Sequence, residues 1–318
     1  MSDTAPATLP PIEVLPRDIS AYRMGNRGVD YVHTLDSGQP GPHVLVNGLT
    51  HGNEFCGMTA VTHLLDSGLR PVRGKLTLSL SNVDAYHLFD AAKPYDSRYV
   101  ERDFNRLWDD ALLDGPTPGS DLDRARALRP IFNEVDALLD LHSTSSPMPP
   151  MLIYQPMDKY LPISNHMHSP LHHVLLRGVK HAGRPLIQYG AYGDPDAAPL
   201  GIVVECGQHF AKSAGDVAIG VAIRFLDFFG LVPRDLAARY PAETGEPKRY
   251  EIEQSVVSKT EHFRFAKPWQ GFEELQQGDL IAVDNGEEIR APFPRCTIVM
   301  PSGRVTVGRD MVLLARPV

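Results

Sequence analysis

Cysteine is scarce in this sequence. The 318 residues include three cysteines, Cys56, Cys206 and Cys296, which are far apart and form no CxxC pair. Such spacing provides neither a disulfide framework nor a set of thiolates for a structural zinc site. We therefore expect a chain that folds in a reducing compartment without disulfide bonds.

Long apolar runs are also missing. Residues 1–20 are rich in proline and acidic residues, and they contain no continuous apolar segment that would serve as a signal peptide or an anchor. The most apolar stretch, residues 217–232, is interrupted by Arg224 and Asp227 and is shorter than a membrane span. We therefore predict a cytoplasmic protein that does not bind membranes.

The chain has no excess of positive charge. Lysine and arginine total 31 residues against 39 aspartates and glutamates, which gives a formal net charge of -8. Nucleic-acid-binding proteins gather basic residues into a positive surface, so we expect no nucleic-acid partner. The 42% of hydrophobic residues is ordinary for a folded globular protein. The composition leaves open whether the chain forms a homo-oligomer.

Short apolar runs alternate with helical patterns over the first 230 residues. Strands are predicted at residues 43–47, 75–80, 137–141, 151–154, 186–188 and 202–205. Helices are predicted at residues 56–66, at residues 122–138, where Pro130 would kink or divide the helix, and at residues 217–229. This alternation predicts an α/β fold with helices on both faces of a mostly parallel or mixed sheet.

The pattern changes after residue 231. Residues 233–247 are polar and contain proline, and beyond them short β-type runs at 280–283, 296–300 and 311–314 are separated by glycine-containing turns. We therefore predict a larger α/β domain at residues 1–240 and a smaller β-rich domain at residues 241–318.

Two histidines and a glutamate follow the ends of predicted strands. His51 and Glu54 lie three positions apart after the strand at 43–47, and His142 directly follows the strand at 137–141. His51 and Glu54 alone would suit a loop histidine beside a solvated glutamate, but ligands in open α/β sheets collect at these strand ends. A His₂Glu set leaves one coordination position open, as catalytic zinc sites do. We predict one zinc ion per chain, although another divalent ion would also suit these ligands.

Glu205 ends an otherwise apolar strand. Burying a carboxylate there without a purpose would be costly. A zinc site that activates water needs a base for the water proton and an acid for the leaving group, and Glu205 is our candidate for both roles. The alternative is a glutamate that is solvated or paired with an arginine.

The segment at residues 97–108 is rich in arginine. Arg98, Asn105 and Arg106 could form a local anion site, because guanidinium groups bind carboxylates and stabilise developing oxyanions. The alternative is a surface charge cluster that pairs Glu101, Arg102 and Asp103, and we assign Arg102 to that role.

At these residues the sequence resembles the succinylglutamate desuccinylase/aspartoacylase family, relatives of the zinc carboxypeptidases. The family pattern HGNE corresponds to residues 51–54, its DLH to residues 140–142 and its VE-x-G to residues 204–207. The resemblance covers most of the chain. It implies a zinc-carboxypeptidase-like catalytic domain with a mixed sheet, followed by a β-rich domain that shapes the pocket.

The resemblance also implies roles for individual residues. Arg98 would polarise the scissile carbonyl, Asn105 and Arg106 would hold a substrate carboxylate, and Glu205 would be the catalytic base. The implied activity is zinc-dependent hydrolysis of the amide bond of a small N-acyl amino acid. A zinc carboxypeptidase is the first alternative, and a non-catalytic protein that binds metal or amino acids is the second.

One departure from the family concerns the substrate. Family members that bind a dicarboxylic amino acid carry a further arginine about ten residues before the catalytic glutamate, whereas residues 185–204 contain no arginine or lysine. Asp194 and Asp196 lie in this window instead. An amino-acid part with a neutral or cationic side chain is therefore at least as well supported as a dicarboxylic one.

Overall fold

The computed structural model describes residues 10–177 and 183–318. In the first part of the chain, up to residue 240, the strands are β1 (Val32–Asp36), β2 (His43–Gly48), β3 (Lys75–Leu80), β4 (Ala137–Thr144), β5 (Met151–Tyr154), β6 (His172–Leu175) and β7 (Leu200–Gln208). In the second part, after residue 240, the strands are β8 (Lys248–Val257), β9 (Arg264–Phe265), β10 (Glu274–Leu275), β11 (Leu280–Asp284), β12 (Glu287–Arg290), β13 (Cys296–Val299) and β14 (Asp310–Pro317).

The helices lie mainly in the first part of the chain. The α-helices are α1 (Phe55–Asp66), α2 (Val83–His87), α3 (Asp110–Leu113), α4 (Ser120–Phe132), α5 (Leu161–His166), α6 (Gly190–Gly193), α7 (Lys212–Phe228) and α8 (Arg234–Ala237). The 3₁₀ helices are η1 (Ser20–Tyr22), η2 (Asp96–Arg98), η3 (Phe104–Arg106), η4 (Asp158–Tyr160) and η5 (Leu186–Gln188).

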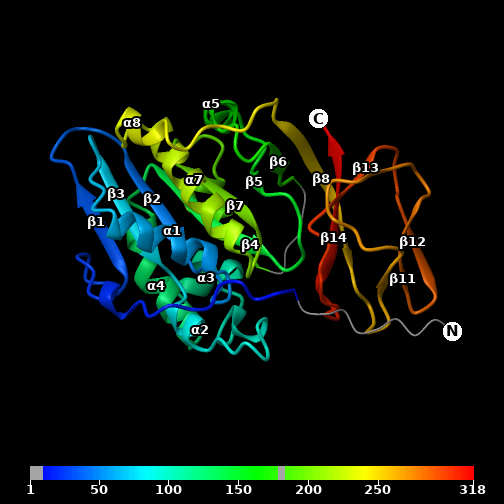
Figure 1. Ribbon diagram of the computed structural model, residues 1–318. Helices are drawn as coiled ribbons and strands as arrows, with labels where there is room; N and C mark the ends of the chain where they lie inside the picture. The colour runs from blue at the N-terminus through cyan, green and yellow to red at the C-terminus, as the bar shows by residue number, and fades with distance from the viewer. Residues whose placement is uncertain (1–9, 178–182) are drawn as a thin grey trace.

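A large mixed sheet runs through both parts (Figure 1), in the strand order β1-β3-β2-β4-β7-β5-β6-β8-β14-β13-β10. Its centre, β3-β2-β4-β7, is parallel, so the carboxyl ends of these four strands meet at one edge. Strands β12, β11 and β9 form a separate antiparallel sheet. The predicted α/β class with a mixed, helix-flanked sheet is confirmed.

Alternate residues of the central strands bury two different apolar layers. On β2, Val44 and Val46 belong to the layer under α1 and α7, whereas Leu45 belongs to the layer under α4. Side chains of a strand alternate between its faces, so helices cover both faces of the parallel centre. The sheet is thereby fixed on both sides, and its carboxyl edge is a rigid platform for side chains.

The predicted domain boundary near residue 240 falls between α8 and β8. Figure 1 shows helices around the strands before this point and strands almost alone after it. Strand β8 nevertheless pairs with β6, so the large sheet crosses the boundary. The division into two domains stays a prediction.

Two predicted elements differ from the structure. Residues 186–188 form η5 and not a strand, because Gln188 N donates to Pro185 O in a tight turn and Leu186 N donates to the Asn105 side chain. The helix predicted at 122–138 ends at Phe132, with Pro130 in its last turn, and β4 starts at Ala137.

Two expectations from composition can be compared with the fold. All three cysteines are buried, and each has a free thiol. Within residues 10–177 and 183–318, no helix combines the length and apolar character needed to cross a membrane.

Candidate active site

The first half of the site is the turn between β2 and α1. It begins at Leu49, whose φ is +56°, and it passes close to neighbouring backbone at Gly52. A Cβ atom on Gly52 would lie 2.4 Å from the backbone of Ala85 and Tyr86, so only glycine fits this position. The tight turn buries both His51 and Glu54 at the carboxyl edge of the sheet.

The second half of the site comes from β4 and β7. Asp140 and His142 are two residues apart on β4, so their side chains lie on the same face. His142 is the register partner of Glu205 on β7, which places these two side chains next to each other. Ligand atoms of His51, Glu54 and His142 all lie within 4.8 Å of one another. The predicted ligand set is thus assembled in space.

Both histidines turn the same ring nitrogen toward Glu54. His51 Nδ1 lies 2.8 Å from Glu54 Oε1, and His142 Nδ1 lies 2.9 Å from Glu54 Oε2. Burial disfavours the charged Glu54 carboxylate, but the two imidazoles outweigh this effect and hold its pKa well below the usual value. The three groups therefore form one compact, buried donor set.

Aspartates hold the opposite ring nitrogens. His51 Nε2 lies 3.0 Å from Asp103 Oδ1, and His142 Nε2 lies 2.8 Å from Asp140 Oδ2. A carboxylate that accepts a hydrogen bond from Nε2–H keeps the ring proton on Nε2 and leaves the Nδ1 lone pair for a metal, as outer carboxylates do around metal-bound histidines. The donor set and its tautomers thus fit a zinc ion.

Glu205 is buried beside this donor set. Its Oε2 atom has no hydrogen-bond partner among the described residues. Burial, helped by the negative charge of Glu54, raises the pKa of Glu205 to about 8. Glu205 is therefore a carboxyl group that can exchange a proton near neutral pH, which a general acid and base must do.

All seven predicted site residues line one cavity of about 590 Å³. Arg98 Nη1 donates to Glu54 Oε1 at 3.1 Å, and the Asn105 side-chain oxygen accepts from Leu186 N at 2.9 Å. The hydrogen bond from Leu186 fixes the orientation of the Asn105 amide group. Burial lowers the pKa of Arg106, the next residue in the chain. The structure brings these residues together, whereas their individual roles stay predictions.

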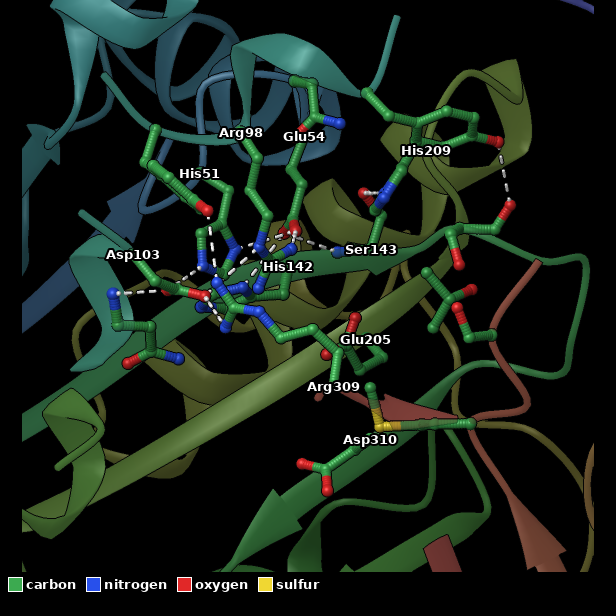
Figure 2. A pocket seen from close by; sticks show the side chains of 18 of the residues that line it. His51, Glu54, Arg98, Asp103, His142, Ser143, Glu205, His209, Arg309 and Asp310 are labelled. Atoms are coloured by element: carbon green, nitrogen blue, oxygen red, sulfur yellow. Dashed lines mark hydrogen bonds and ion pairs between the residues drawn. The ribbon is translucent and has the colours of Figure 1, made fainter. Parts of the chain in front are cut away.

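Sequence reasoning missed several residues of this site. Asp103, which we weighed as part of a surface charge cluster, is buried against His51. Arg309 reaches into the site from the start of β14, and its guanidinium lies 3.8 Å from Asp103 Oδ2 (Figure 2). His209 and Ser143 also line the cavity. The HGNE, DLH and VE-x-G patterns include none of these four residues, so local spacing gave no signal for them.

Comparison with known proteins gives an independent line of evidence. The family model described as the succinylglutamate desuccinylase/aspartoacylase catalytic domain matches residues 40–209. No curated protein sequence matches the chain.

Several solved structures are similar to the chain. Succinylglutamate desuccinylase from Vibrio cholerae is 17% identical, with a TM-score of 0.65 over 91% of this chain and 86% of its own. A succinylglutamate desuccinylase/aspartoacylase from Rhodobacter sphaeroides is 16% identical, with a TM-score of 0.66 over 91% of this chain and 90% of its own. Murine aminoacylase 3 is 21% identical, with a TM-score of 0.62 over 88% of this chain and 96% of its own.

At these identities the solved structures support the shared fold. The family match extends over more than half of the chain and contains the HGNE, DLH and VE-x-G patterns. The chain therefore belongs to the succinylglutamate desuccinylase/aspartoacylase family.

Proposed function

We propose that the protein is a zinc-dependent hydrolase that cleaves the amide bond of an N-acyl amino acid. The observation that carries the proposal is the pair of histidines that turn Nδ1 toward Glu54 while aspartates hold Nε2. One zinc ion held by His51, Glu54 and His142 would supply a Lewis acid and would acidify water.

The other residues of the cavity have separate tasks in this proposal. Glu205 takes a proton from the attacking water and later delivers it to the departing amine. Arg98 donates to the carbonyl oxygen as negative charge develops there. Asn105 and Arg106 hold the carboxylate of the amino-acid half, because a guanidinium and an amide together supply several donors to one carboxylate.

The walls of the cavity favour a small substrate over an extended peptide. Met300, Ser302, Arg304, Arg309 and Leu313 from the second part of the chain line the same cavity as the proposed metal ligands. A wall on this side of the site leaves less room for a peptide that continues past it than for a small substrate. The same observation supports our expectation that the β-rich part shapes the pocket.

A substrate panel tests the proposal. The purified protein is loaded with zinc and incubated with N-acetyl and N-succinyl derivatives of acidic, neutral and basic amino acids, and release of free amino acid is measured. A parallel panel contains peptides with a free carboxyl terminus. We expect release from at least one N-acyl amino acid, with loss of activity after chelation and recovery with zinc. Faster release from the peptides would instead establish a carboxypeptidase.

A further inference from the structure

One buried imidazole beside the site has no task in the proposed reaction. His209 follows β7, is 5% exposed and lines the same cavity as the proposed metal ligands. Its backbone N–H donates to Thr144 O at 2.9 Å, and its ring contacts the rings of Tyr95 and Phe210. The ring is therefore held in one place by its backbone and by its neighbours.

The hydrogen bond between Ser143 and His209 sets which nitrogen carries the proton. Ser143 Oγ lies 2.8 Å from His209 Nδ1, and within residues 10–177 and 183–318 this is the one partner recorded for the Ser143 hydroxyl. Ser143 is 4% exposed, so leaving its O–H without an acceptor would be costly. The hydroxyl therefore donates to Nδ1, and the ring proton lies on Nε2.

The resulting Nε2–H donor faces the cavity. Burial lowers the pKa of His209 to about 4, so the ring is neutral near pH 7 and has one N–H group. In the described part of the chain Nε2 has no recorded hydrogen-bond partner, and it is not among the fully enclosed polar atoms. Nε2–H is thus a fixed donor at the wall of the site.

The position of His209 indicates which half of the substrate it meets. In Figure 2, His209 and Ser143 lie on one side of Glu54 and His142, whereas Asp103 lies on the other side. Asn105, which we propose to hold the carboxylate of the amino-acid half, adjoins Asp103, and its backbone N–H donates to Asp103 Oδ1 at 3.1 Å. With the scissile carbonyl at the proposed metal ligands, the acyl half extends toward His209.

We propose that His209 Nε2–H donates a hydrogen bond to an oxygen on the acyl group, and that the enzyme thereby selects acyl groups with a second carbonyl or carboxylate over plain alkanoyl groups. Ser143 is the positioning residue that fixes the tautomer. The inference rests on the proposed function, because it assumes that an N-acyl amino acid is the substrate.

A series of acyl groups on one amino acid tests the inference. The amino acid is the one most readily released in the substrate panel, and the series compares butyryl with succinyl and with the neutral succinamoyl group of the same length. For the wild type, we expect kcat/KM to be about tenfold to a hundredfold higher for succinyl than for butyryl, as a hydrogen bond to a charged acceptor predicts. Succinamoyl should fall between them.

Variants separate recognition from a structural role. His209→Phe keeps a ring but removes the donor, so it should abolish the preference for succinyl and change kcat/KM for butyryl by less than about threefold. His209→Gln places an amide N–H near the same point and should restore part of the preference. Ser143→Ala frees the tautomer and should reduce the preference without removing it.

The possible failures are distinguishable. An equal loss for all three acyl groups in His209→Phe, or a wild type that does not prefer succinyl over butyryl, overturns the role of His209 and leaves the proposed hydrolase intact. A wild type that releases no amino acid from any N-acyl substrate overturns the proposed function and this inference together.

Discussion

Replacing Asp140 with asparagine should weaken metal binding about tenfold to a hundredfold, as is usual when an outer carboxylate behind a metal-bound histidine is lost. This range corresponds to about 1.4 to 2.7 kcal/mol of binding free energy. Asp140 is fully buried, so water cannot replace its carboxylate. The substitution preserves the size of the side chain and removes its charge.

The hydrogen bonds of Asp140 explain why asparagine is a poor substitute. Its Oδ1 accepts from Asn47 Nδ2 at 2.8 Å and from Thr50 Oγ1 at 2.6 Å, while its Oδ2 lies 2.8 Å from His142 Nε2. Asparagine must keep its oxygen toward the two donors, which turns its NH₂ group toward Nε2. His142 Nε2 must then accept, so the ring proton moves to Nδ1 and blocks the lone pair meant for the metal.

Competition with a chromogenic zinc chelator measures the effect. The dissociation constants of the wild type and of Asp140→Asn are compared at the same pH, with circular dichroism to verify the fold. Asp136→Asn is the matched control, since Asp136 is an exposed aspartate just before the same strand. An unchanged affinity in Asp140→Asn, or an equal loss in both variants, would refute the reasoning.

Three further predictions follow from the site and the core. The Glu205→Gln variant should still bind the metal, because Glu205 lies outside the ligand set. Its kcat should be lower than that of the wild type by about 10² to 10⁴. A loss of kcat of only a fewfold with full metal content would rule out Glu205 as the general base. Arg106→Met should raise KM about tenfold to a hundredfold for substrates with a free carboxylate, and should raise it less for the corresponding carboxamides. Equal increases in KM for both kinds of substrate would contradict the binding of the carboxylate by Arg106. Burial lowers the pKa of His173 to about 4 from 6.5, so the unfolded chain takes up a proton below pH 6.5 that the folded chain refuses. Acidification from about pH 7.5 to about pH 5 should therefore cost about 2 kcal/mol of unfolding free energy at this residue. Urea titrations should show a decline in His173→Gln that is smaller by about this amount than the decline in the wild type and in the exposed control His63→Gln.

Short-range pattern predicted the central strands and the three longest helices of the fold. The strands at β2, β3, β4, β5 and β7 have apolar runs bounded by turn residues, and the apolar face of α7 repeats at helical spacing, so each could be recognised locally. Residues 186–188 look like a strand in isolation. They form η5 because Asn105, far away in sequence, binds the Leu186 N–H. Such a long-range hydrogen bond has no signature in the segment itself.

The same limit applies to the site. His51, Glu54, His142 and Glu205 could be predicted because each lies at the end of a strand, and the topology of a parallel sheet brings those ends together. Arg309 directly precedes β14, more than 200 residues after Asp103, and nothing local indicates that its guanidinium reaches this site. Residues supplied by a distant part of the chain become visible only when the chain is folded.

The position of the metal tests the account most directly. Anomalous diffraction at the zinc absorption edge, from crystals of protein loaded with zinc, locates the ion without reference to activity. We predict one site per chain, with Nδ1 of His51, Nδ1 of His142 and the Glu54 carboxylate as its protein ligands and Glu205 outside the ligand set. A zinc ion bound elsewhere, bound through Nε2 of either histidine, or absent from these three residues would contradict the account.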